Sequence, residues 1–259
     1  MSKKYGLLGE HLGHSYSKTI HERLADYTYD LIELSKTELD TFLTEKKFSA
    51  CNVTIPYKRT VIPYLDVLDE QARRVGAVNT IVNREGILTG YNTDYDGFLY
   101  TLQNCFENLC LNKVIVLGNG GAAQAVFAVL KDLNAKEIVV VKHHPEEGVC
   151  SYEEASRLHN DATFLVNTSP VGMYPNTEAS PIDLTPYQNL TGVVDLIYNP
   201  DKTKLLLQAE SMGIPAQNGL LMLVAQAFFA VEHFLQTTLA KEKLEEVYAS
   251  FTSPSSDKS

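Results

Sequence analysis

Short apolar runs alternate with amphipathic segments along most of the chain. The apolar runs predict strands, and the segments with apolar side chains three or four positions apart predict helices. This order predicts an α/β fold with mainly parallel sheets covered by helices. The expected strands lie over residues 5–8, 28–34, 50–54, 77–82, 113–117, 137–141, 164–167 and 193–197, and the expected helices over 19–26, 36–46, 95–106 and 120–134.

The last third of the chain contains two more expected helices and one irregular segment. Residues 218–236 are apolar almost all round, which predicts a buried helix, and residues 241–251 have the pattern of an amphipathic helix. The segment 169–186 contains four prolines, which predicts a loop without regular structure beyond the end of a strand. Such a loop often borders a ligand site, although a plain surface connection fits the pattern equally well.

A glycine-rich segment follows one expected strand and opens the next expected helix. Residues 118–123 read GNGGAA, which matches the G-x-G-x-x-A pattern. In that pattern the first glycine permits a tight turn, the second lets the backbone approach a pyrophosphate, and the small last residue allows close helix–strand packing. The helix N-terminus then faces the phosphates. A dinucleotide site is therefore expected at Gly118, Asn119, Gly120, Gly121 and Ala122.

The tip of the following strand lacks the acid that often selects the cofactor. An Asp or Glu there would hold a free ribose 2′-hydroxyl, but the sequence continues with Lys142 and His143. These side chains could meet a 2′-phosphate, which favours NADP over NAD. Glu146 and Glu147 follow closely and weaken this preference.

Polar residues cluster at three places in the first third, each where a strand ends or a helix begins. Ser15 and Ser17 precede an expected helix and can offer hydroxyl donors to a carboxylate, or simply cap the helix. Pro56 is placed to start another helix, with Lys58 in its first turn. A cation is unfavourable near that positive end of the helix dipole, which would ease the loss of a proton from Lys58 and suit proton transfer. Taken alone, the pattern also fits an exposed surface lysine. Asp94, in the third cluster, is a candidate for acid–base chemistry or a plain helix cap.

Composition and charge narrow the classes of partner. The 259 residues carry a net charge of −10 at pH 7 and a pI of about 5.2, which argues against broad binding to nucleic acid or anionic membranes. The histidines show no paired ligand spacing, so no metal is expected. The N-terminus shows neither a signal peptide nor a membrane span, and the cytoplasm is the expected location.

Seven short segments, in this order, resemble the shikimate dehydrogenase family. The likeness extends over most of the chain, roughly from Tyr5 to Phe234. Each segment is short, but their number and order make the resemblance specific. The segments are HSYS (14–17), NVTIPYK (52–58), GAVNT (76–80), GYNTD (90–94), GNGGA (118–122), NTSP (167–170) and NGLLMLVAQ (218–226).

The resemblance implies the reversible reaction 3-dehydroshikimate + NADPH ⇌ shikimate + NADP⁺, a step of chorismate and aromatic amino acid biosynthesis. It also implies a substrate-binding domain built from residues 1–94 and 219–259, with a Rossmann NADP-binding domain inserted at 95–218. The partners implied are shikimate or 3-dehydroshikimate, and the chain would act as a monomer or a homodimer.

The family's site residues fall on matching positions of this sequence. Lys58 and Asp94 would be the catalytic pair, in which the ammonium protonates the carbonyl oxygen and the carboxylate orients the ammonium. The implied substrate contacts are Ser15, Ser17 and Tyr198 at the carboxylate and Thr54, Asn79, Asp94 and Gln226 at the ring hydroxyls. The implied cofactor contacts beyond the glycine turn are Lys142, His143, Asn167, Thr168, Ser169, Gly219 and Met222.

One departure from the family leaves the cofactor and the substrate open. Many members carry Asn-Arg-Thr at the tip after the second strand of the cofactor domain, with the arginine on the 2′-phosphate, whereas residues 142–144 here are Lys-His-His. Histidine is mostly neutral at pH 7 and cannot clamp a phosphate as a guanidinium does. The alternatives are a quinate/shikimate dehydrogenase that uses NAD and a non-catalytic ligand-binding relative. A folate-type dehydrogenase is disfavoured by the carboxylate-binding serines.

Overall fold

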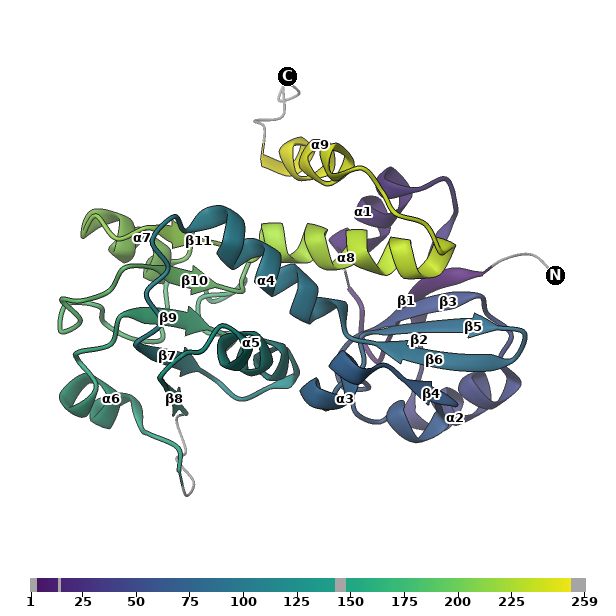
Figure 1. Ribbon diagram of the computed structural model, residues 1–259, viewed down its shortest axis with the longest axis horizontal. Coiled ribbons are helices and arrows are strands. Elements are labelled where there is room, and N and C mark those ends of the chain that lie inside the picture. Colours follow the sequence, from purple (N-terminus) through teal and green to yellow (C-terminus); the bar gives the residue numbers. More distant parts are fainter. Residues whose placement is uncertain (1–3, 14, 143–147, 253–259) are drawn as a thin grey trace. The chain divides into compact units, whose positions relative to one another are not determined.

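The computed structural model describes residues 4–13, 15–142 and 148–252, and the chain forms two compact units. The first unit comprises Met1–Gly97 and Leu223–Ser259, and the second comprises Phe98–Met222. Each unit has its own β-sheet flanked by helices (Figure 1). Two helices, α4 (Thr93–Cys105) and α8 (Leu220–Leu235), carry the chain from one unit into the other.

Within the described residues, the sheet of the first unit has six strands in the order β2-β1-β3-β5-β6-β4. Strand β1 pairs in parallel with β2 and β3, and β4 pairs in parallel with β6, whereas β5 is antiparallel to β3 and β6. The carboxyl ends of β1, β3 and β6 and the amino end of β5 therefore lie at one edge. The strands are β1 (Tyr5–Gly9), β2 (Tyr29–Glu33), β3 (Ala50–Val53), β4 (Val67–Leu68), β5 (Thr80–Arg84) and β6 (Ile87–Tyr91).

Successive side chains of this sheet enter two different apolar clusters. Leu7 packs with Ala230 and Phe234 of α8, whereas its neighbour Leu8 packs with Leu39 and Leu43 of α2. This alternation is what a strand with helices on both faces requires. The helices of this unit, besides parts of α4 and α8, are α1 (Tyr16–Leu24), α2 (Lys36–Glu45), α3 (Glu70–Val75) and α9 (Lys241–Thr252).

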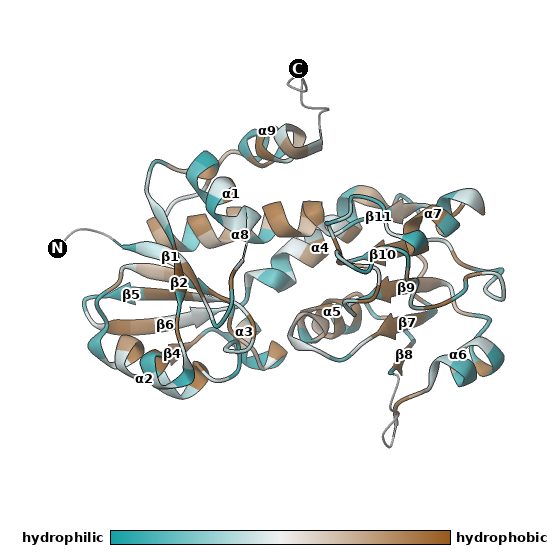
Figure 2. Cartoon of the chain, turned by 180° about the vertical axis from the view of Figure 1, so that it is seen from behind, coloured by the Kyte–Doolittle hydropathy of each residue, from teal (hydrophilic) through white to brown (hydrophobic). Residues whose placement is uncertain are grey.

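Helix α8 is buried along most of its length, which confirms the prediction for residues 218–236. Figure 2 shows the apolar character of this helix, in contrast to the mixed surface of α9. A helix that is apolar on nearly every side can only be stable when most of its surface is covered.

The second unit contains a sheet in the order β11-β10-β9-β7-β8, and all of its pairs are parallel. This is the doubly wound arrangement, which binds ligands beyond the carboxyl ends of the strands. The strands are β7 (Lys113–Leu117), β8 (Glu137–Val141), β9 (Phe164–Asn167), β10 (Val193–Asp195) and β11 (Ala216–Gln217). The helices are α5 (Gly121–Asp132), α6 (Tyr152–Leu158) and α7 (Lys204–Ser211).

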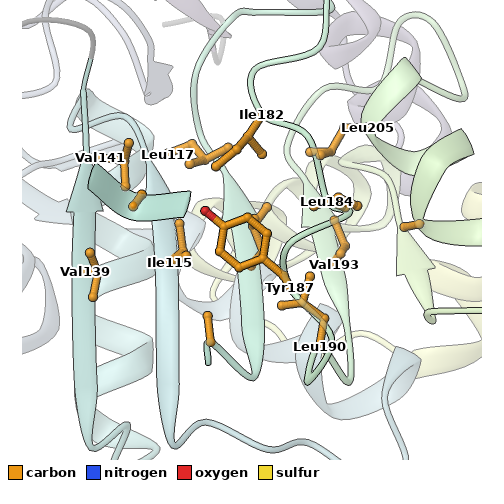
Figure 3. Packing of buried hydrophobic residues seen from close by; sticks show 14 of the residues in the cluster. Ile115, Leu117, Val139, Val141, Ile182, Leu184, Tyr187, Leu190, Val193 and Leu205 are labelled. Carbon is orange, nitrogen blue, oxygen red and sulfur yellow. The ribbon is translucent and has the colours of Figure 1, made fainter. Parts of the chain in front are cut away.

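The proline-rich segment contributes to the core of the second unit although it has no regular structure. The segment 169–186 forms neither helix nor strand, which confirms the prediction. Immediately beyond it, the fully buried ring of Tyr187 lies among Ile115, Leu190 and Val193 (Figure 3). The loop is therefore fixed to the sheet at its end by a large buried side chain.

The predicted fold class is confirmed, but several details differ. Strands β4, β6 and β11 lie outside the ranges expected for strands. Helices α3, α6 and α7 were not expected, because segments of six to eight residues are too short to show a clear helical period. The antiparallel direction of β5 was also not expected. The strand predicted over 77–82 begins only at Thr80, because the N–H of Val78 donates to the Lys58 carbonyl instead of joining the sheet.

Candidate active site

Three segments of the first unit meet at the sheet edge where β1, β3 and β6 end. Thr54 follows β3, Asn79 precedes β5, and Asp94 lies in the first turn of the helix after β6. The backbone joins these segments, because the N–H of Val53 donates to the Asn79 carbonyl at 2.7 Å and the N–H of Asn79 donates to the Tyr91 carbonyl at 3.1 Å. Residues far apart in the sequence are thus held next to one another.

Lys58 and Asp94, called the lysine–aspartate pair below, form a hydrogen-bonded ion pair. Lys58 Nζ lies 2.6 Å from Asp94 Oδ2, and the two side chains are 15% and 10% exposed. A pair that is largely shielded from water interacts more strongly than a surface pair, because the local dielectric constant is lower. The site therefore presents an ammonium donor whose direction is set by a carboxylate.

Lys58 reaches its partner from a series of turns, and the helix predicted to begin at Pro56 is wrong. In a helix the carbonyl of Lys58 would accept from the N–H of Ile62. Instead it accepts from the N–H of Val78 at 2.8 Å, while the N–H of Ile62 donates to the Arg59 carbonyl. Lys58 therefore does not lie at a helix N-terminus, and its ion pair with Asp94 is the feature that indicates function.

Asp94 lies in the first turn of α4 but does not cap it. The cap is Asn92, whose Oδ1 accepts from the N–H of Tyr95 at 3.2 Å. The interpretation of Asp94 as a plain helix cap is therefore wrong. Its two oxygens are used by Lys58 and Asn79 instead.

Asn79 holds the second oxygen of the carboxylate. Its Oδ1 accepts a 2.7 Å hydrogen bond from the N–H of Thr93, a group that can only donate. Asn79 Nδ2 must therefore face the other way, where it donates to Asp94 Oδ1 and to Thr93 Oγ1, both at 3.0 Å. Gln226 Oε1 lies 3.5 Å from the same nitrogen. The structure thus brings together Lys58, Asp94, Asn79 and Gln226 of the predicted site.

The two predicted serines lie at the start of α1, the helix that follows β1. Ser15 is the N-cap, and its Oγ accepts from the N–H of Ser17 at 3.2 Å. The helix begins at Tyr16, three residues earlier than predicted, because this cap closes its first turn. Among the described residues, no hydrogen bond joins either serine or Thr54 to the lysine–aspartate pair.

The glycine turn of the second unit has the geometry that its pattern predicts. Gly118 has φ of +99°, and a Cβ atom there would lie 2.8 Å from Thr168 Oγ1, so only glycine fits. Gly120 is the N-cap of α5, and in the described structure no side chain caps this helix. A Cβ at Gly120 would meet nothing within 4 Å. First-turn N–H groups beside open space fit a dinucleotide pyrophosphate.

Residues Asn167, Thr168 and Ser169 lie directly beside the glycine turn. Thr168 Oγ1 donates to the carbonyl at the end of β7 at 2.8 Å. Asn167 Oδ1 accepts from the N–H and the hydroxyl of Ser169 at 3.0 and 2.7 Å. Asn167 Nδ2 donates to the buried Asp195 at 2.9 Å, and the hydroxyl of Thr203 donates to the same carboxyl at 2.7 Å. The ends of β9 and β10 are thus joined by buried polar bonds.

The other predicted cofactor residues also belong to the second unit. A Cβ at Gly219 would lie 2.0 Å from a carbonyl oxygen just after β10, so this position also requires glycine. Met222 is buried in the first turn of α8. Tyr198, which was predicted to contact the substrate carboxylate, is half-buried beyond β10 in the same unit. Lys142 is half-buried after β8, whereas His143 lies outside the described residues.

Sequence reasoning missed the polar side chains behind the lysine–aspartate pair. Asn52, Thr80 and Thr93 are buried and bonded to one another or to Asn79. A signal for one of them exists, because Asn52 is the polar residue of the otherwise apolar strand β3. The partner Thr80 is set by strand register, which the sequence alone does not give.

The fold and the site together define an α/β protein with a dinucleotide-type glycine turn in one unit and a lysine–aspartate pair in the other. In the part of the chain that the structure describes, no helix is long and apolar enough to span a membrane. The particular family follows from comparison with known proteins.

Residues 7–81 match the family model described as the shikimate dehydrogenase substrate binding domain. Shikimate dehydrogenase (NADP(+)) of Clostridium perfringens strain 13 is 37% identical over 264 residues, which cover 95% of this chain and 97% of that protein. The solved chorismate mutase/shikimate 5-dehydrogenase fusion protein of Clostridium acetobutylicum is 39% identical with a TM-score of 0.89, over 97% of each chain. Shikimate 5-dehydrogenase of Thermus thermophilus, solved with NADP(H) and shikimate, is 29% identical with a TM-score of 0.83, over 96% of this chain and 99% of that one. The chain therefore belongs to the shikimate dehydrogenase family.

Proposed function

We propose that this chain catalyses the reversible NADPH-dependent reduction of 3-dehydroshikimate to shikimate, a step of chorismate and aromatic amino acid biosynthesis, in the cytoplasm. Family membership supports the reaction and the cofactor, since the relatives are named as NADP(+) enzymes. The observation that carries the proposal is the 2.6 Å contact between Lys58 Nζ and Asp94 Oδ2. We assign substrate binding to residues 1–94 and 219–259 and NADP binding to residues 95–218, in a monomer or homodimer.

When bound, NADPH supplies a hydride to the carbonyl carbon, so the protein must supply a proton to the carbonyl oxygen. The Lys58 ammonium is the donor, and its Nζ loses the proton as the hydroxyl forms. Asp94 directs the ammonium and offsets the cost of removing it from water. In the oxidation of shikimate the direction reverses, and neutral Lys58 accepts the hydroxyl proton.

Substrate selection rests on hydrogen bonds to a small polar ring. The serines at the start of α1 combine two hydroxyls with a helix N-terminus, which suits a carboxylate. Buried polar groups that face a missing hydroxyl are left unpaired, so close analogues are disfavoured. The proposed contacts are Ser15, Ser17 and Tyr198 for the carboxylate, and Thr54, Asn79, Asp94 and Gln226 for the ring hydroxyls.

The proposed NADP contacts all come from the second unit. The open first turn of α5 supports pyrophosphate binding there. We assign the cation for the 2′-phosphate of NADP to Lys142, which directly follows β8. The proposed set is Gly118, Asn119, Gly120, Gly121, Ala122, Lys142, His143, Asn167, Thr168, Ser169, Gly219 and Met222.

Initial rates with four substrate–cofactor pairs test this function: shikimate and quinate, each with NADP⁺ and NAD⁺. We expect the highest kcat/KM for shikimate with NADP⁺. The names of the relatives do not favour an NAD-dependent quinate enzyme, and a higher kcat/KM for quinate with NAD⁺ would reverse that conclusion. Tight binding of shikimate without turnover would instead indicate a non-catalytic relative.

A further inference from the structure

Behind the lysine–aspartate pair runs a continuous series of buried hydrogen bonds that the proposed mechanism does not use. The hydroxyl of Tyr29 donates to Asn52 Oδ1 at 2.7 Å, and Asn52 Nδ2 donates to Thr80 Oγ1 at 3.0 Å. Thr80 Oγ1 donates to Asn79 Oδ1, also at 3.0 Å. All four residues are at most 4% exposed, so water does not compete for these bonds.

The direction of each bond is set by partners that have only one possible role. Asn52 Nδ2 also donates to the backbone carbonyl of Asn79 at 3.2 Å, so Asn52 Oδ1 must be the acceptor for Tyr29. Thr80 has a single hydroxyl hydrogen and already accepts from Asn52. The acceptor nearest to Thr80 Oγ1 is Asn79 Oδ1 at 3.0 Å, and Thr93 Oγ1 lies farther away at 3.2 Å. Every donor in the series therefore points toward Asn79.

The end of the series decides how Asn79 presents its amide. With Oδ1 held by the Thr80 hydroxyl and by the N–H of Thr93, Nδ2 faces the Asp94 carboxylate. Without the hydroxyl, Oδ1 loses one donor and keeps the N–H of Thr93 at 2.7 Å and the longer contact with the Thr93 hydroxyl at 3.3 Å. The amide is then freer to rotate, and rotation would bring an oxygen toward the carboxylate and remove a charge-assisted hydrogen bond.

We propose that Thr80 is a positioning residue for the reaction: its buried hydroxyl orients Asn79, which orients Asp94 and through it the Lys58 ammonium. Thr80 itself is fully buried on strand β5 and acts only through Asn79. This inference rests on the proposed function, because it concerns the proton-transfer step. Thr80 is uncharged and buried, so neither its charge nor its position would mark it as part of the site.

The test compares two substitutions of one side chain. Thr80→Val keeps the branched shape and removes the hydroxyl, whereas Thr80→Ser keeps the hydroxyl and removes a methyl group. We expect kcat of Thr80→Val to fall roughly tenfold, as one hydrogen bond allows, and Thr80→Ser to stay close to the unaltered protein. The solvent deuterium isotope effect on kcat should rise in Thr80→Val only, and Kd for NADP⁺ should not change. Thr101→Val, a second fully buried threonine outside the series, should leave kcat unchanged.

A purely structural role for Thr80 predicts something different. Thr80→Val would then lower Tm while kcat per folded molecule and the isotope effect stayed constant, which would overturn the inference. A fall in kcat of Thr80→Ser equal to that of Thr80→Val would overturn it as well. The side-chain amide NMR signals of Asn79 give a readout without substrate, and unchanged signals in Thr80→Val would refute the inference whatever the protein acts on. Absence of any dehydrogenase activity in the unaltered chain would refute only the proposed function.

A double-mutant cycle tests whether the bonds act as one series. Tyr29→Phe removes the first donor and should lower kcat by a smaller factor than Thr80→Val, since two bonds remain intact. In a protein that already carries Thr80→Val, Tyr29→Phe should have almost no further effect on kcat. Independent, multiplying effects of the two substitutions would contradict a connected series.

Discussion

The N–H of Val78 donates a 2.8 Å hydrogen bond to the carbonyl oxygen of Lys58. Val78 directly precedes Asn79, whose side chain holds the carboxylate of Asp94. The backbone of Lys58 and the carboxylate of Asp94 are therefore held by two adjacent residues. The separation of amine and carboxylate depends on this backbone contact as well as on the flexible lysine side chain.

Removal of the amine should abolish most of the activity and little of the binding. In Lys58→Ala we expect kcat for shikimate oxidation to fall by roughly 10²- to 10⁴-fold, the usual contribution of a general acid–base group. The KM for shikimate should change far less, because the other proposed contacts to the carboxylate and the hydroxyls remain. Lys46→Ala is the matched control. Lys46 also forms a 2.8 Å ion pair, with Asp66, but the side chains of Lys46 and Asp66 are 30% and 40% exposed. Near-normal turnover of Lys58→Ala would end the proposed role of this lysine.

Neutralising the carboxylate of Asp94 should slow the same proton transfer as removing the amine of Lys58. Asp94→Asn keeps the shape of the side chain and an oxygen for Asn79, but it removes the charge that directs the ammonium. We expect kcat to fall at least roughly tenfold, with little further loss when Lys58→Ala is added, because the two groups act as a unit. Steady-state rates of the single and double variants measure this. Strictly additive losses in ΔΔG‡ would show that the two residues act separately.

A comparison of two helix N-caps separates an effect on stability from an effect on substrate affinity. Ser15 caps α1 and Ser35 caps α2, so replacement of either by alanine should lower the free energy of unfolding by about 1 kcal/mol. Only Ser15→Ala should also raise KM for shikimate, by roughly 10- to 100-fold, because it removes a hydrogen bond to the substrate carboxylate. Urea unfolding and initial rates on both variants make the comparison. An equal rise in KM for Ser35→Ala would remove the evidence for a carboxylate site at Ser15.

Features set by neighbours in the sequence could be predicted, whereas features set by distant residues could not. Strands such as 113–117 and the glycine turn after them were predictable, because apolar runs and glycine conformations are local properties. The turn at Lys58 was not, because its shape is decided by Val78 on another segment. The same limit hid Thr80, whose proposed role depends on its pairing with Asn52 on the neighbouring strand. Short polar motifs predicted which residues form the candidate site, and tertiary hydrogen bonds decide which of them contact one another.

The buried carboxyl of Asp195 should make stability depend on pH in a characteristic direction. Burial raises its pKa from 3.8 to about 6, although the hydrogen bonds from Thr203, Ile197 and Asn167 act in the opposite sense. The folded state therefore holds this proton more tightly than the unfolded state. The contribution to stability is complete below about pH 3.8 and is lost as pH rises through about 6, a total of roughly 3 kcal/mol for a shift of this size.

Asp195→Asn should flatten that part of the curve of unfolding free energy against pH, because the amide cannot ionise. The new side chain keeps an oxygen for Asn167 and the Ile197 N–H, and the Thr203 hydroxyl can accept from its nitrogen. Burial raises the pKa of Asp96 to about 6 as well, so a reduced fall in stability between pH 4 and 7 should remain, as measured by urea unfolding at each pH.

Asp161→Asn provides a control of opposite sign, because the hydrogen bond from Lys113 lowers the pKa of this exposed carboxyl. Its contribution is present above the unfolded pKa and is lost as pH falls, so its removal should leave the fall between pH 4 and 7 in place. If Asp195→Asn kept the full slope of the unaltered protein, the carboxyl would have to be ionised in the folded state throughout this range. Its hydrogen bonds, and not its burial, would then dominate the energetics where β9 and β10 end.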